Sequence, residues 1–321
     1  MNLSITNECN RRCEYCFQKT WYLSNKKEDI KEMSLETIEN ILNMMDEKEE
    51  HFKIMGGEPL LYSKLFDLLE LAKSKKKTIT IISNITAETS IIERIINDYS
   101  DVVKGWLINS DYPESHESLF TTNLKLFKDN EYFSLSTTLL PDSNKVLESA
   151  NRIIKLIELL DDKNDINVRV SPMAPNHVND GFYDYSLDII HFIETLWTYN
   201  PQIKISFDCP LNCCELHPQV LDMFDRSPMI EYHNNTCSGC GPFDILVDNS
   251  VIYCSSTYDI IRLDNIFDYT TIHDAKKAMF LQWKNYWKTH QIACDYKSCE
   301  HFNPTYCMGL CPAKNNLKLK S

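Results

Sequence analysis

Three cysteines follow the first predicted strand, and their spacing constrains this chain more than any other feature. Residues 9–16 read Cys-Asn-Arg-Arg-Cys-Glu-Tyr-Cys, so Cys9, Cys13 and Cys16 form a C-x3-C-x2-C pattern. Three thiolates this close can hold one Fe–S cluster and leave one iron without a protein ligand. A structural zinc ion is the alternative. Zinc takes four ligands, however, and the nearest histidine, His51, is far along the sequence.

The number of cysteines and the net charge further limit the classes of protein to which this chain can belong. The chain has 13 cysteines in 321 residues and no basic segment followed by an apolar one at its start, so we expect a cytoplasmic protein with reduced thiols. Cysteine-rich spacing in that compartment indicates metal binding or catalysis. The net charge of −13, without a segregated basic patch, argues against a nucleic-acid partner. No apolar run approaches the ~20 residues that a membrane span needs.

The first two-thirds of the chain alternates short apolar runs with helical stripes. Residues 78–82 are all β-branched, which is typical of a buried strand, and Ile38, Ile41 and Leu42 repeat at helical spacing. Strand–helix units in succession predict parallel strands with right-handed crossovers. Six units fall short of a full eight-unit barrel, so we predict an α/β fold with a partial (β/α)6 TIM-like barrel over residues 1–207. The predicted strands are residues 3–5, 52–55, 78–82, 102–108, 133–139 and 166–170.

Residues 208–321 have a different pattern and are predicted to form a cysteine-rich C-terminal auxiliary-cluster domain. This part carries ten of the 13 cysteines, and regular helical stripes vanish apart from residues 275–287. Metal ligation would therefore have to supply much of its folding energy. The segments at 244–248 and 251–254 suggest a short hairpin that turns at Asp248-Asn249-Ser250.

The cysteine loop resembles the radical S-adenosylmethionine (radical SAM) superfamily, whose members carry C-x3-C-x-aromatic-C after a first strand. The resemblance implies that Cys9, Cys13 and Cys16 bind a [4Fe-4S] cluster. It further implies that SAM chelates the fourth iron and that Tyr15 lies against the adenine.

Further segments resemble the same family at the ends of later strands. Gly56-Gly57-Glu58-Pro59 is similar to the GGEP motif, which implies that Gly56, Gly57 and Glu58 receive the methionine ammonium. Asn109-Ser110-Asp111-Tyr112-Pro113 resembles S-x-D-G-P, and Asn109 is expected to bind the ribose hydroxyls. In parallel barrels the active site forms at these strand ends. Each polar residue taken singly is also suited to a turn or a helix cap.

The C-terminal third resembles the SPASM extension of radical SAM enzymes, which carries auxiliary [4Fe-4S] clusters. The family's final cysteine is missing. A second auxiliary cluster would therefore take a thiolate from Cys209, Cys213 or Cys214, or keep an open iron. Structural zinc is the alternative, because C-x2-C and C-x3-C spacings suit zinc too. The resemblance implies one cluster on Cys237, Cys240, Cys254 and Cys311 and a second on Cys294, Cys299 and Cys307.

These resemblances predict an enzyme that cleaves SAM reductively to a 5′-deoxyadenosyl radical, which removes hydrogen from a substrate. The expected substrate is a peptide or protein, as in the maturation of ribosomally made peptides. One expected partner is a low-potential electron donor such as flavodoxin or ferredoxin. Because the first strand starts at residue 3, a separate leader-binding protein is also expected. The alternatives are a radical SAM enzyme acting on a small natural-product intermediate, or a non-catalytic metal-binding regulator. No pattern singles out a general base or a radical quencher.

Overall fold

The computed structural model divides into two compact units, which we describe separately. The first unit comprises Met1–Ile108, Ser118–Leu126 and Gly239–Asn285, and the second comprises the rest of the chain. Among the described residues, no helix is long and apolar enough to cross a membrane. The structure describes residues 1–16, 30–130, 132–161, 166–173, 185–207, 218–231, 243–254 and 257–289.

The first unit is built on a largely parallel sheet. Strand β1 (Asn2–Thr6) runs parallel to β2 (His51–Gly56) on one side and to β9 (Asp244–Ile245) on the other. Strands β3 (Thr78–Ser83) and β4 (Val103–Asn109) continue the parallel order. Every residue of β1 is buried, as expected for a central strand in a sheet that is covered on both faces.

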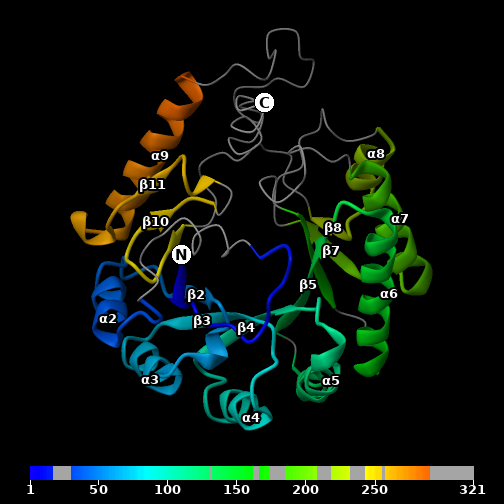
Figure 1. The fold of residues 1–321 in the computed structure, drawn as a ribbon, viewed down its shortest axis with the longest axis horizontal. Helices are drawn as coiled ribbons and strands as arrows, with labels where there is room; N and C mark the ends of the chain where they lie inside the picture. Colours follow the sequence, from blue (N-terminus) through cyan, green and yellow to red (C-terminus); the bar gives the residue numbers. More distant parts are fainter. Residues whose placement is uncertain are drawn as a thin grey trace. The chain divides into compact units, whose positions relative to one another are not determined.

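Three helices connect these strands and confirm the predicted crossovers. Figure 1 shows α2 (Leu35–Asn43), α3 (Leu65–Ser74) and α4 (Thr89–Asp98) on the outer side of β2, β3 and β4. The hydroxyl of Ser34 caps α2 by accepting a hydrogen bond from the Thr37 N–H at 3.0 Å. Helix α5 (Glu117–Leu124) lies between two 3-10 turns, Glu114–His116 and Lys125–Phe127.

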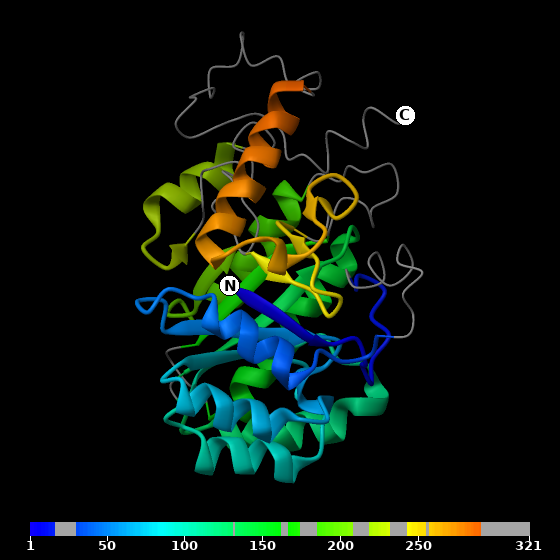
Figure 2. The same cartoon turned by 90° about the vertical axis from the view of Figure 1, so that its left-hand side faces the viewer.

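A hairpin from late in the chain joins the edge of this sheet. Strand β9 pairs antiparallel with β10 (Val251–Ile252), which pairs with β11 (Arg262–Leu263). The predicted turn is confirmed: Asn249 has a φ of 69°, a left-handed conformation that asparagine tolerates. Figures 1 and 2 show α9 (Ile272–Thr289, orange) alongside these strands (yellow). The division at residue 207, however, stays a prediction, because much of the sequence beyond it lies outside the described residues.

The second unit carries further parallel strands with helices on one side (Figure 1). The sixth predicted strand–helix pair is followed by two more short strands that the sequence pattern did not indicate. They have four and two residues, which is too few to show a repeating pattern of apolar residues. Helix α6 buries Val146, Ala150, Ile153 and Ile157, whereas Leu147 is 44% exposed. The elements are β5 (Phe133–Leu139), α6 (Ser143–Leu159), β6 (Asn167–Pro172), α7 (Ser186–Tyr199), β7 (Lys204–Phe207), α8 (Pro218–Arg226) and β8 (Ile230–Glu231).

Candidate functional site

The cysteine loop leaves the end of β1 and is held there by the backbone that follows β2. The Gly57 N–H donates to the Thr6 carbonyl at 2.7 Å, and the Glu58 N–H donates to the Glu8 carbonyl at 2.8 Å. The Glu8 N–H in turn donates to the Thr6 hydroxyl at 3.1 Å. The path of the chain from β1 to Cys9 is therefore set by main-chain hydrogen bonds, which do not depend on long side chains.

Two glycines make this close approach possible. Gly56 has a φ of 143°, and a Cβ at this position would lie 2.3 Å from the Thr6 carbonyl oxygen. A Cβ on Gly57 would lie 2.0 Å from the Glu8 carbonyl oxygen. Neither position tolerates a side chain, because the obstructing atoms are backbone. The space left by the missing side chains is thus filled by the backbone of Thr6 and Glu8. The predicted contact of the two glycines with SAM stays a prediction.

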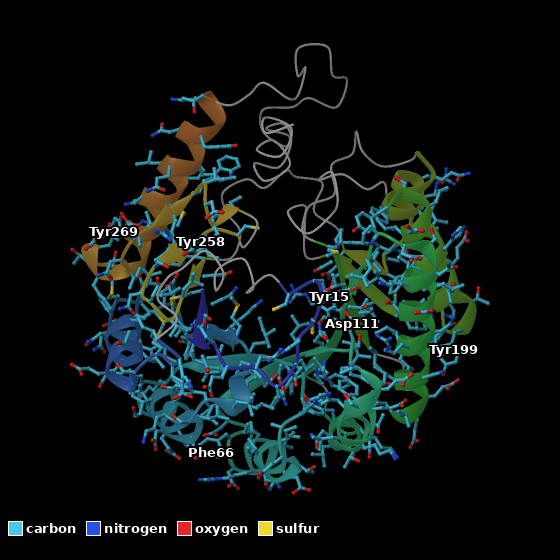
Figure 3. All side chains as sticks on the ribbon, in the orientation of Figure 1. Tyr15, Phe66, Asp111, Tyr199, Tyr258 and Tyr269 are labelled. Atoms are coloured by element: carbon cyan, nitrogen blue, oxygen red, sulfur yellow. The ribbon has the colours of Figure 1, made fainter. Side chains whose placement is uncertain are left out.

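The three predicted cluster ligands are thiols on this one loop, and none of them forms a disulfide. Cys9 is exposed, whereas Cys13 and Cys16 are half-buried. Tyr15, labelled in Figure 3, is half-buried on the same loop. Desolvation raises the pKa of the Cys9 thiol to about 11; the Arg11 N–H lowers it, and Glu58, Cys13 and Cys16 raise it further. The three thiols therefore lie close enough to influence one another electrostatically.

These thiols fit a [4Fe-4S] cluster. Such a cluster spreads its cysteine ligands over different irons, so the thiolates surround it and do not meet at one point. In the parts of the chain that are described, no three His, Cys, Asp or Glu side chains converge as ligands of a single ion. The fit therefore rests on three thiols outside any disulfide, on their shared loop and on their mutual electrostatic influence. Loading would require the proton of Cys9 to leave, because the thiolate is the ligand.

Arg11 lies buried inside the cysteine loop, a feature that the sequence analysis missed. Its side chain is 6% exposed, and its Nη2 donates to the Asn84 carbonyl at 2.8 Å. Its guanidinium lies 5.7 Å from the centroid of the Phe120 ring, within cation–π range. Arg12, its neighbour, is exposed. Because the two arginines are adjacent, the sequence pattern alone does not indicate which of the two side chains is buried.

Glu58 lies in a buried network of hydrogen bonds. Its side chain is fully buried and accepts hydrogen bonds from the Ser83 hydroxyl at 2.7 Å, the Asn84 N–H at 2.7 Å and the Leu60 N–H at 3.1 Å. Desolvation raises the pKa of the carboxyl, and these three donors and Arg11 lower it. The carboxylate therefore fastens the end of β2 to the end of β3, and its contact with the SAM ammonium stays a prediction.

Asn109 and Asp111 belong to the second unit. The Asn109 Oδ1 accepts from the Asp111 N–H at 3.2 Å, and the predicted contact of Asn109 with ribose stays a prediction. The Asp111 side chain, 10% exposed, accepts from the Thr137 hydroxyl at 2.7 Å and the Thr138 N–H at 2.9 Å. Arg152 reaches the same carboxylate at 3.5 Å. Asp111 (labelled in Figure 3) thus ties the loop after β4 to β5 and α6.

The predicted auxiliary-cluster ligands fall mostly outside the described residues. Cys254 is described: it is a half-buried cysteine two residues after β10 that forms no disulfide, and its carbonyl accepts from the Thr257 N–H at 3.0 Å. The hairpin that presents it is anchored by a buried hydrogen bond between Asn2 Nδ2 and Asp244 Oδ1 at 2.7 Å. The predicted ligands outside the described residues are Cys209, Cys213, Cys214, Cys237, Cys240, Cys294, Cys299, Cys307 and Cys311.

Comparison with known proteins supports the N-terminal assignment. The radical SAM superfamily profile matches residues 3–104, which contain the cysteine loop and β1 to β3. The chain is 24% identical over 243 residues to the radical SAM cyclopropyl synthase TigE of Paramaledivibacter caminithermalis. It is 28% identical over 99 residues to GTP 3′,8-cyclase of Campylobacter lari. These matches cover 70% and 30% of this chain, and 46% and 30% of the respective relatives.

Solved structures show the same fold. SuiB of Streptococcus suis, crystallised with S-adenosylmethionine, aligns with a TM-score of 0.66 at 16% identity, over 100% of this chain and 74% of SuiB. SuiB bound to its precursor peptide SuiA aligns with a TM-score of 0.60 at 15% identity, over 87% of this chain and 65% of SuiB. The predicted parallel α/β fold is confirmed. Residues 3–104, which include the thiol loop, therefore match the radical SAM superfamily, and the fold of the chain resembles that of SuiB.

Proposed function

We propose that this protein is an enzyme that binds a [4Fe-4S] cluster through Cys9, Cys13 and Cys16 and uses it with S-adenosylmethionine. When bound, the cluster would supply the electron that breaks the C5′–S bond of SAM, giving methionine and a 5′-deoxyadenosyl radical that takes a hydrogen atom from a substrate C–H bond. The observation that carries the proposal is the three-thiol loop at the start of the matched domain.

The chain's own residues have three tasks in this proposal. Main-chain hydrogen bonds from Gly57 and Glu58 hold the loop in place before the cluster assembles. Tyr15 and the backbone at Gly56 and Gly57 would bind SAM, and Asn109 would bind its ribose hydroxyls. The buried guanidinium of Arg11 would supply a positive charge to the anionic cluster and its thiolates.

We further propose a peptide or protein substrate and a SPASM-type C-terminal region. Support comes from the fold shared with SuiB, which was crystallised with a precursor peptide, and from the cysteine spacing. Cys254, at the end of the hairpin, would be one ligand of an auxiliary [4Fe-4S] cluster, together with Cys237, Cys240 and Cys311. Cys294, Cys299 and Cys307 would hold a second. A flavodoxin or ferredoxin would deliver the electron.

Anaerobic reconstitution tests the catalytic proposal. Wild-type protein should form 5′-deoxyadenosine from SAM when given a low-potential reductant, and its iron and sulfide contents should exceed one cluster per chain. The triple variant Cys9→Ala, Cys13→Ala, Cys16→Ala should lose this activity while keeping the iron of its C-terminal region. Activity in the triple variant would contradict the assignment.

The auxiliary clusters have their own test in the same preparations. Cys254→Ala should lower iron content and soluble yield, because ligation supplies folding energy to this region. Cys214→Ala by itself should change little, because Cys209 and Cys213 are alternative thiolates for the second cluster. About four irons per wild-type chain together with stoichiometric zinc would refute the auxiliary clusters and leave the N-terminal proposal intact.

The substrate class is tested separately. The purified enzyme is incubated with short peptides encoded beside its own gene, and mass spectrometry follows their modification. Loss of hydrogen or a new cross-link in a peptide, coupled to 5′-deoxyadenosine formation, supports the proposal. Turnover with small molecules alone would favour the natural-product alternative.

A further inference from the structure

Asn84, at the C-terminal end of β3, reaches across to the first cysteine of the loop. Its side-chain Nδ2 lies 3.8 Å from the Cys9 sulfur and donates to the Asn10 Oδ1 at 3.0 Å. Asn84 is 8% exposed, so water does not readily replace this donor. The backbone N–H of Arg11 approaches the same sulfur at 3.4 Å. Cys9 is therefore a thiol with two N–H donors directed at its sulfur.

The neighbouring hydrogen bonds fix which end of the Asn84 amide faces Cys9. The Asn84 Oδ1 accepts from the Thr86 N–H at 2.9 Å and from the Thr86 hydroxyl at 2.5 Å. The Asn10 Nδ2 donates to the Thr86 carbonyl at 2.8 Å and to its hydroxyl oxygen at 3.1 Å, which leaves the Asn10 Oδ1 to accept from Asn84. Rotating the Asn84 amide by 180° would set donors against donors at Thr86, so this network holds the NH2 group toward the sulfur.

We propose that Asn84 is a positioning residue that tunes the reduction potential of the cluster on Cys9. This inference rests on the proposed function, since it requires a cluster there. Reduction adds negative charge to the cluster and its thiolates, and an N–H donor in a buried setting stabilises that charge. Asn84 therefore makes the cluster easier to reduce by its electron donor.

The test is a redox titration of the reconstituted enzyme, followed by EPR. The relevant signal is the one that changes when SAM is added, which separates this cluster from any auxiliary one. Asn84→Ala should keep the iron content. It should lower the equilibrium constant for one-electron reduction by about threefold to tenfold, a shift of ~28–59 mV to more negative potential. The main-chain bonds of Asn84 to Glu58 and Arg11 do not depend on its side chain.

Asn123 provides a matched control. It is also fully buried, and its Nδ2 donates to the carbonyls of Ile85 and Ala87 at 2.8 and 2.9 Å. Asn123→Ala therefore disturbs the same loop after β3 without removing a donor from Cys9, and its potential should equal that of the wild type. An equal potential in Asn84→Ala and Asn123→Ala would overturn the inference. The absence of any SAM-responsive cluster in the wild type would instead refute the proposed function and, with it, the inference.

A measurement on wild-type protein covers the case in which Asn84→Ala does not fold. Protein labelled with ¹⁵N in its asparagine side-chain amides is reduced and examined by pulsed EPR. A ¹⁵N coupling to the SAM-responsive cluster is the expected result, because the amide of Asn84 is hydrogen-bonded to a cluster ligand. No detectable coupling would overturn the inference.

Discussion

Replacing Glu58 with alanine should destabilise the protein strongly, because three buried donors would lose their common acceptor. These donors are the Ser83 hydroxyl and the N–H groups of Asn84 and Leu60, all on residues less than 10% exposed. A buried donor without a partner costs about 1–3 kcal/mol, so three cost about 3–9 kcal/mol. The variant also no longer has to bury a carboxylate, which offsets part of this cost. The expected net loss in the free energy of unfolding is about 3–5 kcal/mol.

Urea titrations followed by circular dichroism, without SAM, measure this loss. Glu32→Ala is the matched control: its carboxylate also accepts two hydrogen bonds, from the N–H and hydroxyl of Ser63, but at a solvent-accessible position. Water replaces those bonds, so the control should lose less than about 1 kcal/mol.

The reasoning is refuted if the two variants lose the same small amount of stability. If Glu58 also binds the SAM ammonium, Glu58→Ala would in addition weaken SAM binding by about 1.5–3 kcal/mol, the value of a hydrogen bond to a charged group.

Two further changes probe the loop contact and the hairpin. Gly57→Ala would place a Cβ 2.0 Å from the Glu8 carbonyl oxygen and should lower iron content and the urea midpoint. Gly105→Ala would place its Cβ 2.8 Å from the Thr80 hydroxyl, a side-chain atom, and should lower the urea midpoint less; equal effects would contradict the steric argument. Burial raises the pKa of Asp244 to about 7, with the Asn2 hydrogen bond opposing it. The folded protein therefore binds the proton more tightly, and its free energy of unfolding should fall as pH rises from about 4 to about 7, by up to ~4 kcal/mol. Asp244→Asn should flatten that slope in urea titrations across this range, and an unchanged slope would contradict the assignment.

Much of the fold follows from local sequence patterns. The β-branched run at residues 78–82 and the helical stripe of Ile38, Ile41 and Leu42 predicted a strand and a helix, because the period of apolar residues reflects which face is buried. The turn at Asn249 was also predictable, since few residues adopt its left-handed φ. The cysteine spacing at 9–16 indicated a cluster-binding loop, because ligands of one cluster can lie close together along the chain, and this cluster stays a prediction.

Other features were decided only when distant segments met in the tertiary structure. The pairing of β9 with β1 joins residues 242 positions apart, as the Asn2–Asp244 hydrogen bond shows, and no local pattern encodes such a partner. The same holds for Glu58: no local pattern indicates that its buried carboxylate accepts hydrogen bonds from Ser83 and Asn84 at the end of β3. Composition and spacing determine which chemical groups a loop offers. Which of those groups remain available depends on what packs against them, and that is a property of the folded chain.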